Sequence, residues 1–174
     1  MSLRTCMLWL AIAAPACAHG AAQGEPPDLA PLAEAVQQLR AATVHAAHEA
    51  SACRMAFPDM GDELRHASFD WFMRNRSWIP EVDKAYQRLV QLQAKGDLAR
   101  ISQRLSDDEA EERRQSAGME AGLQALPAPQ QRKRCEGFAA GLSRYDESGD
   151  QVAAPLAVLR RDLHLIPDFI RTWR

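Results

Sequence analysis

The stretch DLAPLAEAVQQLRAATVHAAHEASACRMAFP, residues 28–58, decides the fold class. Its apolar residues recur at steps of three and four, the spacing that places side chains on one face of an α-helix. Asp28 suits a helix cap, and Pro31 fits a first turn, where its missing N–H has no partner to lose. Pro58 interrupts the pattern. These signals predict one long amphipathic helix that ends near Pro58.

Within this helix the segment HAAHEASAC, residues 45–53, combines two histidines, a glutamate and a cysteine. At about 100° per residue, Cys53 lies beside the apolar face, whereas His45, His48 and Glu49 point to the polar side. The glutamate follows the second histidine, so the order is not that of the zinc-protease motif. The pattern predicts a structural cysteine beside a solvated face, and no metal site.

The residues before this helix have the pattern of a secretory signal. A short basic start, MSLRT, precedes the apolar run CMLWLAIAAPA and the small residues ACA before His19. The apolar run is about half the roughly 20 residues needed to cross a bilayer. We expect residues 1–18 to be removed after Ala18 and the protein to be periplasmic or secreted. Residues 19–27 should be a flexible leader. A lipid anchor at Cys17 is an alternative, but APAC lacks the usual large aliphatic residue before the cysteine.

Cleavage after Ala18 would remove Cys6 and Cys17, so only Cys53 and Cys135 would remain. Two cysteines in an oxidising compartment favour one disulfide. The bond would close a loop of about 82 residues, and the chain-entropy estimate of its contribution is roughly 4 to 5 kcal/mol.

Further helical patterns follow along residues 28–174, which we interpret as a single domain. A second helix should end at Asn75 and a third should run from Pro80 to the stop signal Gly96. Ser106 with Glu109 resembles a capping box that would open another helix. Two more helical patterns surround Cys135 and follow the segment DESGD, and no stretch is typical of a strand. The sequence predicts an all-α antiparallel bundle of five or six helices with one disulfide.

Two charged runs have ordinary explanations in a helical protein. The acidic run SDDEAEERR, residues 106–114, suits a solvated helix start better than an acid–base pair. The basic run at residues 132–134 has no local explanation, and we expect it to pair with an acidic surface, with the acidic residues 107–112 as a candidate. The net charge of −2 and the 25% share of charged residues do not favour nucleic-acid binding.

The aromatic segment FDWFMRNRSW, residues 69–78, is the candidate contact surface. We expect Trp71 and Phe72 to belong to the core. The remaining large and cationic side chains cover more than one face of a helix, so some should be left for a protein partner. These candidate contact residues are Phe69, Met73, Arg74, Arg76 and Trp78.

The sequence contains no nucleophile elbow, phosphate loop, paired-cysteine redox motif or haem-attachment motif. It therefore predicts neither catalysis nor a cofactor. The leading hypothesis is an exported protein that acts by protein–protein recognition, as an immunity protein, inhibitor, adaptor or envelope-complex subunit does. A carrier of a small molecule or metal is the alternative, with His45, Glu49 and either His66 or His164 as ligands. A hydrolase whose site is assembled from distant residues is the third hypothesis.

Overall fold

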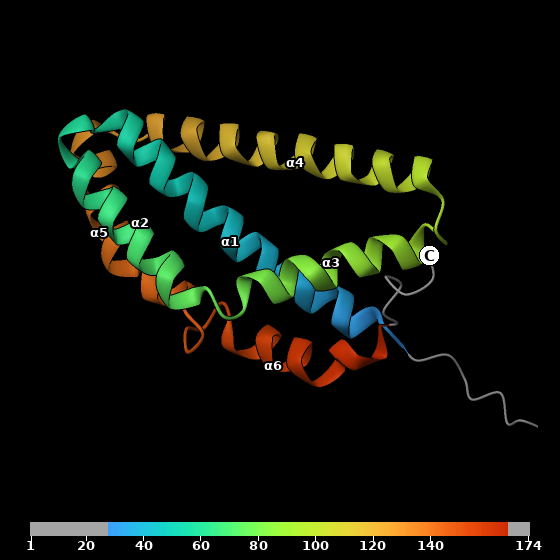
Figure 1. The fold of residues 1–174 in the computed structure, drawn as a ribbon. Helices are drawn as coiled ribbons and strands as arrows, with labels where there is room; N and C mark the ends of the chain where they lie inside the picture. Colours follow the sequence, from blue (N-terminus) through green and yellow to red (C-terminus); the bar gives the residue numbers. More distant parts are fainter. Residues whose placement is uncertain (1–27, 167–174) are drawn as a thin grey trace, which may run out of the picture.

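The computed structural model describes residues 28–166, which form six α-helices joined by short connections (Figure 1). The helices are α1 (Ala30–Ala56), α2 (Gly61–Asn75), α3 (Ile79–Gln93), α4 (Leu98–Gln124), α5 (Ala128–Gly141) and α6 (Ala153–Asp162). Three 3-10 turns accompany them, η1 (Pro58–Met60), η2 (Leu142–Tyr145) and η3 (Leu163–Leu165). Residues 28–166 contain no strand, which confirms the all-α class. The predicted signal peptide, leader and Cys17 lie outside the described residues.

Helix α1 is the centre of the molecule. It contacts each of the other five α-helices, and Figure 1 shows it running through the middle of the fold. Its predicted apolar face is buried at Leu32, Leu39, Ala46 and Ala50. Other small residues, such as Ala42, are buried as well, and their size lets neighbouring helices approach closely on several sides.

The ends of α1 and α3 follow the sequence signals closely. The Asp28 carboxylate accepts a hydrogen bond from the backbone N–H of Ala30 at 3.0 Å, and α1 stops one residue before Phe57. Helix α3 has Pro80 in its first turn. It is followed by Lys95 and Gly96, both with positive φ, at 52° and 77°. The left-handed conformation at Gly96 is the usual helix stop.

Helix α4 differs from the prediction, because it is one continuous helix from Leu98 to Gln124. Its cap is Asp97, whose carboxylate accepts hydrogen bonds from the N–H groups of Ala99 at 2.9 Å and Arg100 at 3.3 Å. The predicted capping box at Ser106 is therefore wrong. No glycine or proline separates residue 98 from residue 106, so the helix begun at Asp97 continues through it.

The acidic run in α4 is only partly solvated. The Glu112 carboxylate lies 2.7 Å from a terminal nitrogen of Arg40 in α1, and Asp108 lies 4.0 Å from the other. The Arg40 guanidinium also covers the ring of Tyr86 in α3, 3.6 Å from the ring centre. A single arginine of α1 thus joins α4 and α3.

The predicted disulfide joins α1 to α5. The Cys53 and Cys135 sulfurs are bonded, their Cα atoms are 5.5 Å apart, and neither residue is exposed to solvent. This Cα separation is in the range usual for disulfides. The bond fixes the carboxyl-terminal end of the central helix to a helix 82 residues later in the chain.

Within residues 28–166, no helix combines the length and the apolar character needed to cross a bilayer.

Candidate functional site

The outer face of α2 carries three large apolar side chains that are exposed to solvent. Phe69 is 60% exposed, Phe72 41% and Met73 43%. Their spacing of three and four residues places them next to one another on one side of the helix. We call these three residues the α2 apolar face. Phe72 was expected in the core, and that expectation is wrong; its ring instead lies edge-on against buried Trp71, with centroids 4.9 Å apart.

Two arginines accompany this face. Arg74 donates from Nε to the Asp146 carboxylate at 3.0 Å and keeps about half of its side chain exposed. Arg76 is exposed and has no ion-pair partner among residues 28–166. Both therefore remain accessible to a partner, as do Phe69 and Met73.

Trp78 does not belong to this surface, because it is fully buried. The chain bends after Asn75, and the bend turns the Trp78 ring into the core. There the indole N–H donates to the Asn75 side-chain oxygen at 2.7 Å, and the ring lies edge-on to Trp71. The prediction of Trp78 as a contact residue is thus corrected.

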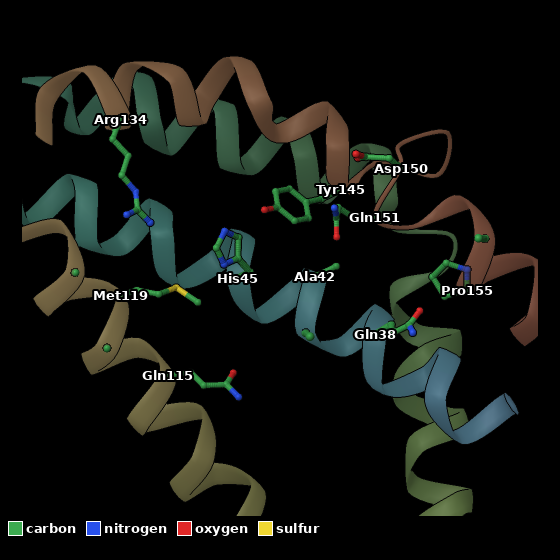
Figure 2. A pocket seen from close by; sticks show the side chains of 14 residues that line it. Gln38, Ala42, His45, Gln115, Met119, Arg134, Tyr145, Asp150, Gln151 and Pro155 are labelled. Carbon is green, nitrogen blue, oxygen red and sulfur yellow. The ribbon is translucent and has the colours of Figure 1, made fainter. Parts of the chain in front are cut away.

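A groove opens on another side of the molecule, between α1, α4 and the segment from η2 to α6 (Figure 2). Its volume is about 830 Å³, within the range typical of ligand sites. Small residues of α1, α4 and α6 line much of it. Its polar lining is provided by Gln38, His45, Gln115, Arg134, Tyr145 and Gln151, with Asp150 at the edge.

One end of the groove meets a buried carboxylate. Glu49 is 9% exposed; one of its oxygens lies 2.8 Å from His45 Nε2, and the other accepts from Arg134 Nε at 2.8 Å. The hydrogen bond to His45 and then the hydrogen bond and charge of Arg134 hold the pKa of Glu49 below its ordinary value of 4.5, although burial opposes this. Glu49 was expected on a solvated face. That expectation is wrong because α5 covers this part of α1.

The basic run at residues 132–134 finds its partners in the same region. Arg134 meets Glu49, and Arg132 donates to the Asp59 carboxylate at 2.8 Å and to Glu136 at 3.1 Å. The expected pairing with the acidic run of α4 is not found; those acids face Arg40 and arginines of their own helix.

The Tyr145 ring lies beside His45, with centroids 5.4 Å apart. Burial, followed by the charge of Glu49, raises the pKa of the Tyr145 hydroxyl above its ordinary value of 10.0. The hydroxyl therefore stays protonated at physiological pH and is available as a hydrogen-bond donor. Figure 2 shows it pointing into the groove.

The histidines considered as metal ligands are not brought together. His66 is exposed on α2, and a ring nitrogen of His164 lies 2.8 Å from the backbone oxygen of Arg161. In the described part of the chain, no three or more His, Cys, Asp or Glu side chains are placed to hold a metal ion.

Sequence reasoning missed the groove. Its glutamines come from α1, α4 and the loop before α6, and each is an ordinary surface residue in its own segment. A signal was present in the pair Gly118 and Gly122, because two glycines one turn apart are costly in a helix and no close neighbour requires them here.

No protein-family model, curated protein or solved structure matches the chain, so the function is inferred from its own geometry.

Proposed function

We propose that this chain is an exported, non-catalytic helical protein that acts through protein–protein recognition at the α2 apolar face. The observation that carries the proposal is the exposure of Phe69, Phe72 and Met73 side by side on one helix. Adjacent exposed apolar side chains often mark interaction sites. Fully burying an exposed side chain of this size contributes about 1.5 to 3 kcal/mol, and since these three keep about half of their surface exposed, a partner that covers them gains about half of that from each.

The positive charge of Arg76 beside the face favours a partner that places a carboxylate there. Arg76 lies one turn beyond Phe72 and Met73 and has no ion-pair partner in the described part of the chain. Phenylalanine, methionine and arginine are all enriched at protein interfaces relative to the rest of the surface. A partner surface with an apolar ridge beside a carboxylate complements both features.

The proposal of export is supported by the signal-like residues 1–18 and by the Cys53–Cys135 disulfide, since such bonds persist mainly in oxidising compartments.

We further infer that the helices form the expected antiparallel bundle. The course of α1 against α3 and α6 supports this: in Figure 1, α1 runs toward the end where α5 begins, whereas α3 and α6 run back toward the start of α1. Helix α4 is the exception, because it runs in the same direction as α1.

Site-specific crosslinking tests the proposed face. Phe69 is replaced by the photo-reactive benzoylphenylalanine, the chain is produced in its native host, and the periplasmic fraction is irradiated. Leu98, which is 73% exposed on α4, carries the same probe in the control. The intact mass of the uncrosslinked protein reports whether it begins at His19.

We expect one protein to be crosslinked from position 69 and not from position 98. The added substitutions F72S and M73S should abolish that product without unfolding the chain, because both side chains are exposed. No product at position 69, or the same products from both positions, would contradict recognition at this face. A mass that includes residues 1–18 would contradict export.

A further inference from the structure

We propose that the groove between α1, α4 and the η2–α6 segment binds a short peptide in an extended conformation with both of its ends free. This site is separate from the α2 apolar face, and no residue of that face lines it. The inference stands on the shape of the groove, on its unused hydrogen-bonding groups and on the charges at its two ends.

The groove is long and open along its floor. Gly118 and Gly122 line it one helical turn apart, and a Cβ atom on either would meet nothing within 4 Å. Along α1 its lining runs from Gln38 to His45, seven residues or about 10 Å at 1.5 Å per residue, and Arg134 of α5 continues it beyond His45. An extended chain covers about 3.3 to 3.6 Å per residue, so about three residues span the α1 lining and one or two more carry the chain past it to Arg134.

The side walls provide groups suited to a peptide backbone. The Gln38 amide nitrogen donates to Glu34 at 3.1 Å, and the Gln115 amide nitrogen donates to Glu111 at 3.2 Å. In both cases the side-chain oxygen remains to accept from a ligand N–H. The Tyr145 hydroxyl has no hydrogen-bond partner among residues 28–166 and points into the groove, where it can donate to a ligand carbonyl (Figure 2).

The two ends of the groove differ in charge. Arg134 uses Nε for Glu49, which leaves its terminal nitrogens for a carboxylate. Asp150 has no ion-pair partner in the described chain and suits an ammonium group. In Figure 2 these residues lie on opposite sides of Tyr145. A free peptide carries a carboxylate and an ammonium at its two ends. A phosphate-rich ligand fits poorly, because Glu49 already shares the Arg134 cation and Asp150 would repel it.

The test measures retention of defined probes by the purified full chain. The first probe is a pool of unblocked pentapeptides randomised at the three central positions. The second is the same pool with acetylated and amidated ends, and the third is a mixture of neutral oligosaccharides of two to five units. Equilibrium dialysis followed by mass spectrometry identifies what the protein retains.

A groove-filling variant, G118L/G122L, is compared with a control, A117L/A121L. The glycines have open space at Cβ and no positive φ, so larger side chains enter the groove without strain. Ala117 and Ala121 are exposed on the same helix with the same spacing and do not line the groove. Helical content and thermal midpoint confirm that both variants fold.

We expect wild type and A117L/A121L to retain a subset of the unblocked peptides, and G118L/G122L to bind that subset at least about tenfold more weakly. Blocking the ends should weaken binding about fivefold, the order of one exposed ion pair. D150N should reduce the effect of blocking the ends without abolishing it, because Arg134 still meets the free carboxylate. Retention of the oligosaccharides instead, retention of no probe, or equal binding by G118L/G122L would each overturn the proposal.

Discussion

Glu49 shows how one residue of the central helix takes on several contacts. It is nearly buried, it accepts from Arg134 of α5, and it lies within hydrogen-bond distance of His45 four residues earlier. Because Arg134 donates to the Glu49 carboxylate, the ionised form of Glu49 helps to hold the Arg134 side chain at the end of the groove. The charge of this carboxylate should therefore affect the stability of the fold.

We expect that stability contribution to depend on pH. The pKa of Glu49 is lower in the folded chain than its ordinary value of 4.5, so the ionised carboxylate stabilises the fold above about pH 4.5 and ceases to do so as the pH falls through the folded value. E49Q should reduce the free energy of unfolding by about 1 to 2 kcal/mol at pH 7. The difference from wild type should shrink at pH 3. Urea denaturation followed by tryptophan fluorescence measures both values.

D62N is the control for this experiment, because Asp62 also lies near an arginine, Arg65, but on the exposed side of α2. It should show no comparable loss at either pH. A difference between E49Q and wild type that is the same at pH 7 and pH 3 would contradict the assigned role of the Glu49 charge.

Trp78 shows what residue patterns alone could not reveal. It follows a cluster of aromatic and basic residues, and nothing in its own segment distinguishes it from exposed Phe69. Its burial depends on Asn75, which is 1% exposed, accepts from the Trp78 ring and donates to the Asp146 carboxylate 71 residues away at 2.9 Å. The contact with Asp146 is set by the packing of the whole chain, so the sequence near Trp78 does not indicate it.

At the scale of elements, the sequence offers two start signals for α4, and the structure uses the one at Asp97 and not the one at Ser106. Gly96 and Asp97 stand next to each other, and the structure uses both, one to end α3 and the other to cap α4. Ser106 and Glu109 have the spacing of a capping box but lie in the interior of the helix. A capping pattern acts only where the preceding residue leaves the helical conformation.

This difference predicts opposite outcomes for two alanine substitutions. D97A removes the carboxylate that accepts from two backbone N–H groups and should cost about 1 kcal/mol of unfolding free energy. S106A replaces an exposed interior residue by a better helix former and should change stability by less than about 0.5 kcal/mol, if anything upward. Chemical denaturation of both variants measures the change. A larger loss for S106A than for D97A would contradict a single α4.

Most of the helices were predictable because they carry their own periodic pattern and end signals, as α1 does from Asp28 to Pro58, whereas the start of α4 was misplaced. The disulfide was predictable because so few cysteines were available. The candidate surface was predictable in part, since exposure of Phe69 and Met73 follows from the excess of large side chains on a short helix. The groove was not predictable, because its walls come from helices whose relative positions no local pattern specifies.

At the scale of the whole molecule, the disulfide holds the central helix against α5. Both sulfur atoms are buried, so a thiol reagent should reach them only after the chain opens. Without the bond, the unfolded chain is no longer closed into a loop of 82 residues and gains conformational entropy. By the chain-entropy estimate, the free energy of unfolding then falls by up to about 4 to 5 kcal/mol.

We expect C53A, C135A and the double variant to lose similar amounts of unfolding free energy, because each removes the same bond. Equilibrium urea unfolding of the three proteins, with oxidised wild type as reference, measures the losses. Losses of the two single variants that simply add up in the double variant would contradict a bond between these residues, as would rapid alkylation of native wild type.

The central position of α1 also bears on how this sequence tolerates change over evolutionary time. A bulkier side chain at Ala46 or Ala50 would press on packed neighbours in the core, whereas α4 buries only Leu123 in the described structure. Substitutions should therefore be rare in α1 and frequent on the outer surface of α4. A saturation library selected for folded protein would show this contrast directly.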